Sequence, residues 1–262
     1  MAIEVFNRYE NKYLIDKNTY RKLQDEILKY MELDDYNKSH EFYTITNIYY
    51  DTEDNYLIRS SLSKPKYKEK LRLRAYGIPK DGEKVFLEIK KKFCGLVNKR
   101  RTTLELKEAY DFVTTGIKPE LKEHINKQVL NEIEYMLKIY NLQPKLYLAY
   151  DRMAMFSKEN RDLRITFDTN IRSRRYDLKL EAGDHGERLL ESDKWLMEVK
   201  SQKSIPFWLS KLFSEYKIVS TSFSKYGSEY TKLLMSNRSL KGGINICSNQ
   251  YLAQPQLVQQ CL

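Results

Sequence analysis

The sequence predicts an α+β protein in which antiparallel strands form a barrel or deeply curved sheet with a polar, basic interior, accompanied by several helices. Three observations favour this fold: strands that alternate basic and apolar residues, an excess of positive charge, and many tyrosines. The 262 residues include 46 Lys and Arg against 36 Asp and Glu, a formal net charge of +10, and 21 Tyr. Tyr favours strands and can place its hydroxyl at a wet boundary. Such a composition excludes a disordered chain and indicates an anionic partner.

The first elements are read from residue periodicity. Residues 6–15 alternate charged and bulky side chains, which predicts a strand. Asp16 is a suitable N-cap for a helix over about 17–33, whose apolar stripe includes Leu23 and Ile27. A run of β-branched and aromatic residues over 43–50 predicts the next strand.

The strongest pattern lies in three strands expected over 66–76, 84–92 and 97–103. Side chains alternate across a strand, so each strand has one basic face and one mainly apolar face. The first basic face holds Lys66, Lys68, Lys70, Arg72 and Arg74. The second holds Lys84, Phe86, Glu88, Lys90 and Lys92, and the third holds Val97, Lys99, Arg101 and Thr103. Turns at Asp81-Gly82 and Cys94-Gly95 would make these strands antiparallel neighbours that share the basic face.

The second half begins with a helix and returns to strands. Apolar residues at helical spacing predict a helix from Pro119 to about residue 141, with Pro144 ending it. Strands are expected over 145–156, 162–168, 171–180 and 195–200, and helices near 206–216 and 225–236. Their basic faces carry Tyr150 with Arg152, Arg164 with Asp168, then Arg172 and Arg174 in phase, and Glu198 with Lys200. We therefore expect one domain over 1–236 with a helical insertion at about 105–141, followed by a peripheral or poorly ordered tail over 237–262.

Rows of cations on several strands can be explained in two ways. A single basic strand face is often just a solvated sheet surface. Like charges directly opposite one another destabilise a sheet, however, and the first basic face has five cations and no acid. A barrel or deeply curved sheet with an anion inside accounts for this pattern and leaves few exposed edge strands.

The expected anion is a string of phosphates. Duplex nucleic acid is the alternative for a protein of this charge, but its binders usually present basic loops, a recognition helix or stacking aromatics. Arg binds phosphate bidentately and Lys acts as a point charge. The rare acids on the basic faces, Glu10, Glu88, Glu198 and Asp168, could hold a hard divalent cation together with phosphate oxygens. For each Glu, an ordinary salt bridge to a neighbouring Lys is an equally good explanation.

Other classes of protein are disfavoured. The three Cys and three His have no metal-ligand spacing, which argues against a zinc site and a Cys–His nucleophile. Unpaired thiols suggest a reducing cytoplasm. No stretch approaches the roughly 20 apolar residues of a membrane helix, so we expect no membrane insertion by this chain.

Several motifs, in order, resemble the VTC domain, the polyphosphate polymerase branch of the triphosphate tunnel metalloenzyme (CYTH-like) superfamily. The opening Arg8-x-Glu10-x-Lys12 resembles the first strand of that family, and Leu71-Arg72-Leu73-Arg74 its paired-Arg strand. Further similarities lie in Phe86-Leu87-Glu88-Ile89-Lys90, Lys99-Arg100-Arg101, Tyr150-Asp151-Arg152, Leu163 to Thr169, Leu196 to Lys200, and Phe223-Ser224-Lys225-Tyr226. The resemblance covers roughly residues 4–235.

This resemblance implies an antiparallel β tunnel barrel of about eight strands with decorating helices. It also implies a polyphosphate polymerase that transfers the γ-phosphoryl group of ATP to a growing chain, assisted by Mn²⁺ or Mg²⁺. The implied catalytic residues are Lys12, Arg72, Arg74, Lys90, Arg152 and Arg164. The expected phosphate-binding residues are Arg8, Lys70, Lys99, Arg101, Tyr150, Lys200 and Lys225, and the metal ligands Glu198, Glu88 and Glu10. Arg8 and Ser222 depart from the family pattern, which has Glu and, in eukaryotic members, Lys there; the first departure moves the expected metal site to Glu198.

With no regulatory region apparent, the chain is similar to the free-standing bacterial type. Its expected partners are ATP and polyphosphate, and a membrane partner protein is left open. Two other functions remain: a metal-dependent triphosphate hydrolase of the same superfamily, and a non-catalytic module that binds polyphosphate or RNA.

Overall fold

One curled antiparallel sheet organises the molecule. The computed structural model describes residues 9–39, 41–94, 96–159, 161–202 and 204–241. Eight strands follow the order β1-β10-β8-β7-β3-β4-β5-β6, and each neighbouring pair is antiparallel. Their bounds are β1 (Tyr9–Asp16), β10 (Lys194–Ser201), β8 (Arg164–Arg174), β7 (Gln143–Ser157), β3 (Tyr43–Asp51), β4 (Tyr67–Tyr76), β5 (Lys84–Phe93) and β6 (Leu96–Glu105). Short strands β2 (Met31–Leu33) and β9 (Glu187–Arg188) pair with β7 and β8.

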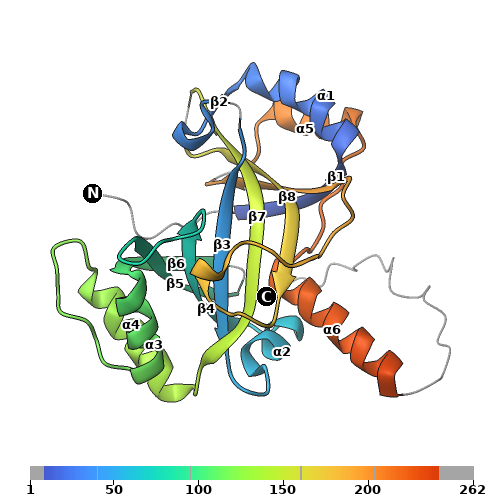
Figure 1. Cartoon of the computed structure of the whole chain (residues 1–262). Coiled ribbons are helices and arrows are strands. Elements are labelled where there is room, and N and C mark those ends of the chain that lie inside the picture. Colours follow the sequence, from blue (N-terminus) through green and yellow to red (C-terminus); the bar gives the residue numbers. More distant parts are fainter. Residues whose placement is uncertain (1–8, 40, 95, 160, 203, 242–262) are drawn as a thin grey trace, which may run out of the picture.

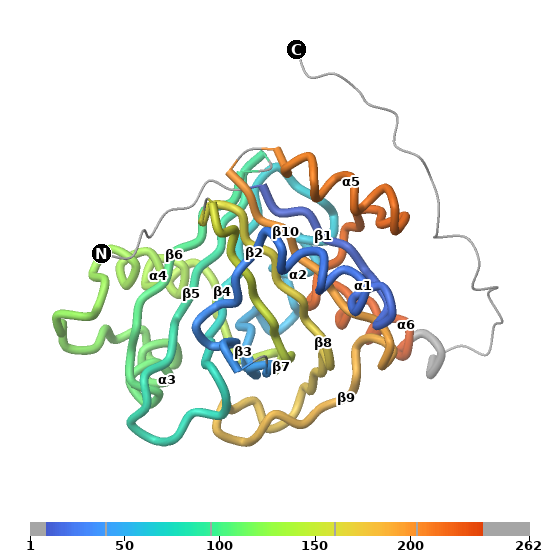
Figure 2. The backbone as a smooth tube through the Cα atoms, turned by 90° about the horizontal axis from the view of Figure 1, so that it is seen from above, coloured from blue at the N-terminus to red at the C-terminus, as the bar shows by residue number. Residues whose placement is uncertain are grey.

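The predicted fold class is confirmed, and the barrel is a half-barrel. In the described part of the chain, β1 and β6 are the two ends of the strand path. Figure 2, which looks down on the view of Figure 1, shows the sheet curled around its concave side. An ion pair links β1, at one end of this path, to β5, near the other end, because Lys90 Nζ lies 3.7 Å from Glu10 Oε2.

Helices cover the convex face in two places. The apolar residues of β3 to β6, such as Leu73 and Leu87, pack with α3 (Leu106–Thr115) and α4 (Lys127–Ile139) in one cluster. Those of β1, β10, β8 and β7, such as Met197 and Phe167, pack with α1 (Lys17–Leu28) and α5 (Phe207–Glu215) in another. Burying the apolar alternate residues outward leaves the basic alternate residues facing inward, as the sequence predicts.

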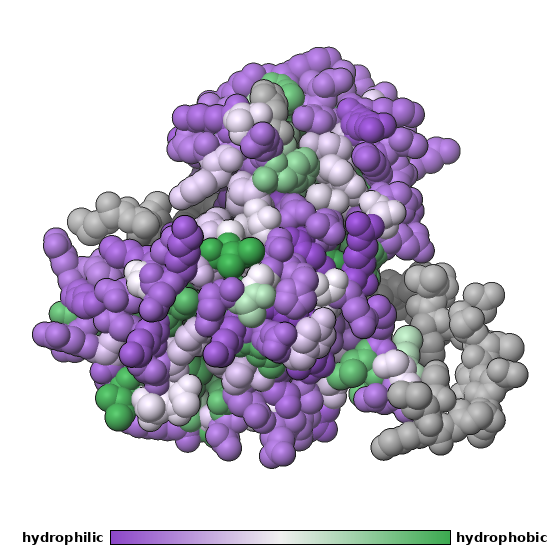
Figure 3. Space-filling view, viewed as in Figure 1, coloured by the Kyte–Doolittle hydropathy of each residue, from purple (hydrophilic) through white to green (hydrophobic). Residues whose placement is uncertain are grey.

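A third apolar cluster fills one end of the concave face. Here α2 (Tyr56–Leu62) and α6 (Lys225–Lys241) lie against β3, β7 and β8, at the lower end of the sheet in Figure 1. The cluster contains Ile45, Tyr49, Ile58, Leu146, Leu148, Tyr150, Ile171, Leu196, Tyr226 and Tyr230. The interior is therefore polar and basic along part of its length and closed by packed aromatic and aliphatic side chains at one end. Outside, hydrophilic side chains cover most of the face in Figure 3.

Two expected helices have different bounds. The helix expected over 17–33 ends at Leu28, and Met31–Leu33 form β2. The helix expected from Pro119 begins at Lys127, because Asn126 is its N-cap and accepts a hydrogen bond from Val129 N at 3.1 Å. An earlier helix, α3, occupies Leu106–Thr115 and begins with a capping box formed by Glu105 and Glu108. Helix α4 ends at Ile139, five residues before Pro144, which lies in β7 and so does not itself end the helix.

The prediction that Arg172 and Arg174 lie on the basic face is wrong, because β8 contains a bulge. The strands expected over 162–168 and 171–180 are one strand, β8, with an irregular register opposite residues 149–151 and a left-handed Asn170 (φ 48°). A one-residue irregularity reverses the faces of the residues that follow it. Ile171 therefore joins the concave apolar cluster. Arg174 lies over the ring of Tyr147, which belongs to the convex cluster.

Candidate functional site

The basic part of the concave face is organised around buried carboxylates. Glu88 on β5 lies across the ladder from Arg72 on one side and Arg101 on the other. Arg72 Nε donates to Glu88 Oε2 at 2.7 Å, and Lys99 Nζ lies 2.7 Å from Glu88 Oε1. Arg72 also donates to the Tyr49 hydroxyl at 3.2 Å. Burial opposes ionisation of Glu88, but Lys99 and Arg72 hold its pKa well below its usual range.

A second centre forms around Glu198 on β10. Four cations from four elements lie within 4 Å of its carboxylate: Lys200 at 3.1 Å, Lys225 at 3.3 Å, Lys12 at 3.5 Å and Arg152 at 3.6 Å. Burial again opposes ionisation, and the nearby cations, led by Lys225 and Lys200, lower the pKa of Glu198 well below its usual range. Strand pairing produces this arrangement, since Lys12 is the ladder partner of Glu198.

Asp168 joins this centre to α6. Arg152 donates to both Asp168 carboxylate oxygens, at 2.6 and 2.7 Å, and the two residues are ladder partners on β7 and β8. Lys225, the first residue of α6, lies 2.5 Å from Asp168 Oδ2. Arg152 and Lys225 also lie over the ring of Tyr150, at 5.0 and 4.4 Å from its centroid.

Other cations on this face have weaker partners, or none within the described residues. Arg74 is 6% exposed, yet it forms no ion pair with any residue that the structure describes, and its Nε has no hydrogen-bond acceptor there. Lys70 likewise has no ion pair within the described ranges and lies over the Tyr226 ring. Arg164 lies 3.3 Å from Asp34, and its Nε also lacks an acceptor in this part of the chain. A buried guanidinium Nε–H without an acceptor is costly, so Arg74 and Arg164 favour an anionic ligand.

The pKa values show how crowded the positive charge is. Burial, followed by repulsion from Lys90 and Lys68, lowers the pKa of the Lys70 ammonium to about 7. Burial lowers the pKa of Lys99 to about 7 despite the adjacent Glu88 carboxylate, with Arg72 and Arg74 adding to the shift. At Glu10 burial acts to raise the pKa, but Lys200, Lys90 and Lys12 outweigh it and lower the pKa to about 2. Phosphate oxygens would stabilise the protonated form of both lysines.

The three proposed metal ligands do not form one cluster. Glu10 and Glu198 share two cations, Lys12 and Lys200, whereas Glu88 is paired separately with Arg72 and Lys99. In the described part of the chain, no group of three or more His, Cys, Asp or Glu is arranged to hold a metal ion. Two carboxylates with substrate phosphate oxygens fit Mg²⁺ or Mn²⁺, which often bind through one or two carboxylates. The pair Glu10 and Glu198 fits such an ion better than Glu88.

Most other predicted residues lie on the same face. Lys90 is the ladder partner of both Lys70 and Lys99, and Lys200 is the partner of Glu10 and Arg164. Arg101 lies at the exposed margin, with its guanidinium 4.7 Å from the Phe86 ring centroid. Arg8 falls outside the described residues. The roles assigned to all of these residues remain predictions.

Sequence reasoning missed Asp51. It is fully buried at the end of β3 and accepts hydrogen bonds from Leu57 N, Ile58 N and the Tyr226 hydroxyl at 2.8, 2.9 and 2.9 Å. It thereby ties α2 and the start of α6 to the sheet, which positions Lys225. Its only signal in the sequence is an acid ending an apolar strand, which is too common to identify it.

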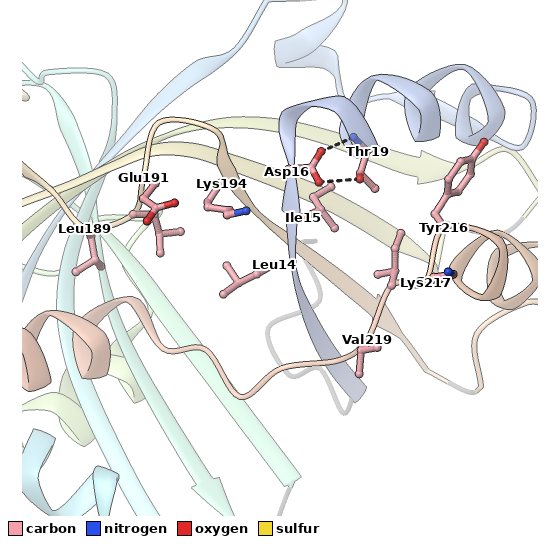
Figure 4. Close-up of a pocket in the computed structure, with 12 residues that line it drawn as sticks. Leu14, Ile15, Asp16, Thr19, Leu189, Glu191, Lys194, Tyr216, Lys217 and Val219 are labelled. Carbon is pink, nitrogen blue, oxygen red and sulfur yellow. Dashed lines mark hydrogen bonds between the residues drawn. The ribbon is translucent and has the colours of Figure 1, made fainter. Parts of the chain in front are cut away.

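A pocket of about 520 Å³ lies apart from this basic face. Figure 4 shows it beside the end of β1, between residues 189–194 and 216–219, with Asp16 bonded to Thr19 at its rim. None of the predicted site residues that the structure describes lines it. Asp16 is the N-cap of α1 and accepts a hydrogen bond from Thr19 N, so this side of the pocket has a structural role in starting the helix.

These features define a class: a curled antiparallel sheet whose concave face holds cations paired to a few buried carboxylates, as in triphosphate tunnel proteins. The chain belongs to the VTC domain family, whose pattern matches residues 7–234. The resemblance seen in the strand motifs is thus confirmed by an independent family match.

Individual proteins are similar to this chain. Vacuolar transporter chaperone complex subunit 4 of Schizosaccharomyces pombe is 27% identical over 208 residues, covering 70% of this chain and 28% of that protein. The chain thus spans about 28% of the length of this relative. A candidate adenylate cyclase from Bacillus halodurans shares the fold, with a TM-score of 0.54, 15% identity, and coverage of 85% of this chain and 96% of that one. A candidate adenylyl cyclase from Hippeastrum, described as having a dominant triphosphatase activity, has a TM-score of 0.49 and 13% identity, covering 88% and 96%. Among the described helices, none has the length and apolar character needed to cross a membrane.

Proposed function

We propose that this chain is a polyphosphate polymerase that transfers the γ-phosphoryl group of ATP to the end of a growing polyphosphate chain. One observation carries the proposal: Arg74 is buried on the concave face, forms no ion pair with the described residues and has no acceptor for its Nε there. Its charge and that of Arg152 both act on nearby Arg164. Membership of the VTC family and the similarity to a chaperone complex subunit support it.

The proposed chemistry needs positioning and charge neutralisation more than covalent catalysis. Arg74, Arg152 and Arg164 would contact the equatorial oxygens of the transferred phosphoryl group, while Lys12, Lys90 and Arg72 hold the flanking phosphates. A terminal oxygen of the phosphate chain attacks the γ-phosphorus, the bond to the β-phosphate bridging oxygen breaks, and ADP leaves. The chain end is already anionic, so no general base is required.

The remaining residues would hold the rest of the polyanion and the metal. Lys70, Lys99, Arg101, Lys200 and Lys225 would bind phosphates further along the chain. Glu198, with Glu10, would hold Mn²⁺ or Mg²⁺, which supplies charge neutralisation to phosphate oxygens. Partner chains, including a membrane protein that receives the product, and a cytoplasmic location belong to the same proposal.

Product analysis tests the proposal. Purified protein is incubated with Mn²⁺ and ATP labelled at either the α- or the γ-phosphate, and products are separated on a gel. Label from the γ position is expected in a ladder of increasing length, and label from the α position is expected in ADP alone. Orthophosphate as the sole γ-labelled product would instead identify a triphosphate hydrolase. Tight binding of tripolyphosphate without turnover would identify a binding module.

A further inference from the structure

Four aromatic rings meet at the end of the concave face where β3 begins, opposite the end of β3 that leads into α2. They come from four elements: Tyr36 from the short helix η1 (Asp35–Asn37), Tyr43 from β3, Tyr76 from β4 and Phe86 from β5. Tyr36 and Tyr76 are parallel within 2°, with ring centroids 5.4 Å apart. Tyr43 lies 5.6 Å from Tyr36 and 5.8 Å from Tyr76, and Phe86 meets Tyr76 edge-on at 5.8 Å. We call these four residues the aromatic cluster.

The aromatic cluster is partly open to solvent. Tyr36 is 64% exposed and Tyr76 is 36% exposed. None of the four is among the buried residues of the three apolar clusters. Rings stacked at the surface expose apolar faces to water, which costs free energy. A ligand that stacks on these faces would remove that cost. This separates them from rings such as Tyr20 and Trp195, whose 4.0 Å stack lies inside the convex core.

The cluster also adjoins cations that form no ion pair with the described residues. The Arg74 guanidinium carbon lies 5.0 Å from the Tyr76 ring centroid, and that of Arg101 lies 4.7 Å from the Phe86 centroid. Tyr43 is the ladder partner of Arg152. Burial raises the pKa of the Tyr43 hydroxyl to about 12, so this ring is neutral at physiological pH. An apolar stacking surface therefore borders a phosphate-binding surface.

We propose that the aromatic cluster stacks the purine base of the nucleoside triphosphate donor, so that the donor's phosphates reach Arg74 and Arg152 from this end. The inference rests on the proposed function and adds to it the binding site of the base. Aromatic rings stack on any base, with larger bases giving more contact, whereas an inorganic phosphate chain gains nothing from them. A donor and an inorganic chain would then be distinguished at this end of the site.

The test compares two ligands on single variants of Tyr36. Isothermal titration calorimetry measures binding of a non-hydrolysable ATP analogue and of inorganic tripolyphosphate. For Tyr36→Ala we expect the affinity for the analogue to fall about tenfold, while the affinity for tripolyphosphate stays at the wild-type value. Tyr36→Phe keeps the ring and is expected to bind both ligands as the wild type does. Tyr135→Ala is the matched control, because Tyr135 is 67% exposed on α4, away from the concave face.

Each result decides the matter. An unchanged affinity of Tyr36→Ala for the ATP analogue, or an equal loss for both ligands, overturns the base-stacking site while leaving the polymerase proposal standing. A wild-type protein that binds tripolyphosphate but not the analogue also overturns it. If the wild type binds neither ligand, the proposed function itself fails, and the stacking site with it.

Discussion

Two buried arginines in the site differ in what surrounds them. Arg152 has a bidentate partner in Asp168, and each side chain is almost fully buried. Arg74 is equally buried but has no ion-pair partner among the described residues. Removing one member of a buried pair leaves an uncompensated charge, whereas removing an unpaired buried charge relieves one.

Substitution should therefore separate ligand binding from stability. We expect Arg74→Gln to lower the affinity for tripolyphosphate by about tenfold or more, since a charge-assisted contact is lost, while the free energy of unfolding stays equal or rises. Arg152→Gln should lower both, with a loss of unfolding free energy of about 3 kcal/mol. Urea denaturation and calorimetry measure the two quantities. A large loss of stability in Arg74→Gln would contradict this assignment.

At the scale of elements, Asp51 connects the functional end of α6 to the sheet. Its carboxylate is shared by two backbone N–H groups of α2 and the hydroxyl of Tyr226, and Lys225 is the neighbouring residue. The first turn of α6 thus supplies Tyr226 to the apolar cluster on the concave face and Lys225 to the group of cations around Glu198.

Loss of this carboxylate should affect fold and site together. Asp51→Ala leaves three buried donors without an acceptor, so we expect the free energy of unfolding to fall by about 3 kcal/mol or more. Tripolyphosphate affinity should also fall, because Lys225 loses its fixed position. Tyr226→Phe removes one of these hydrogen bonds and should lower unfolding free energy by only about 1 kcal/mol. Equal urea midpoints for Asp51→Ala and the wild type would refute the proposed link.

The elements also show what the sequence could and could not predict. Period-two alternation placed Arg72, Glu88 and Lys99 on one face, because each lies in an unbroken strand. The same rule failed for Arg172 and Arg174, since the irregularity at Asn170 reverses the phase and has no clear sequence signal. The apolar cluster under α2 and α6 was also not predicted, because its members come from strands and helices far apart in sequence. Lys225 was identified through the family resemblance alone.

At the scale of the whole molecule, many cations share the confined concave face, so the stability of the fold and the binding of a ligand are both expected to depend on pH. Lys70 and Lys99 have pKa values of about 7 in the ligand-free protein, against 10.5 for an ordinary lysine. Between pH 7 and about 10 the unfolded chain therefore binds more protons than the folded one at these two residues. The unfolding free energy rises with pH in that window, and their destabilising effect is greatest below pH 7. If Lys70 and Lys99 bind phosphates as proposed, polyanion binding requires their protonated forms, and the affinity for the ligand is expected to fall as the pH rises.

This coupling can be measured at pH 7 and pH 9. We expect the wild type to gain stability over this range relative to the double variant Lys70→Met/Lys99→Met, and its affinity for tripolyphosphate to fall. Calorimetry at pH 8.5 in buffers of different ionisation enthalpy should show protons taken up on binding, and the double variant should take up fewer. The same proton uptake in both proteins would mean that these lysines are already charged in the empty site.

The buried carboxylates on the concave face already neutralise part of its positive charge before any ligand binds. Glu198 alone has four cations within 4 Å, and Glu88 and Asp168 serve neighbouring cations in the same way. These acids neutralise the neighbouring cations, and a phosphate that binds as proposed would have to displace them from those cations. Breaking each carboxylate–cation ion pair costs free energy, which reduces the binding free energy gained per phosphate. A long polyanion would therefore make many contacts, most of them weak. In the proposed polymerase, a growing chain would then advance by one phosphate through small exchanges between neighbouring cations, and a finished chain would be released without breaking one strong contact.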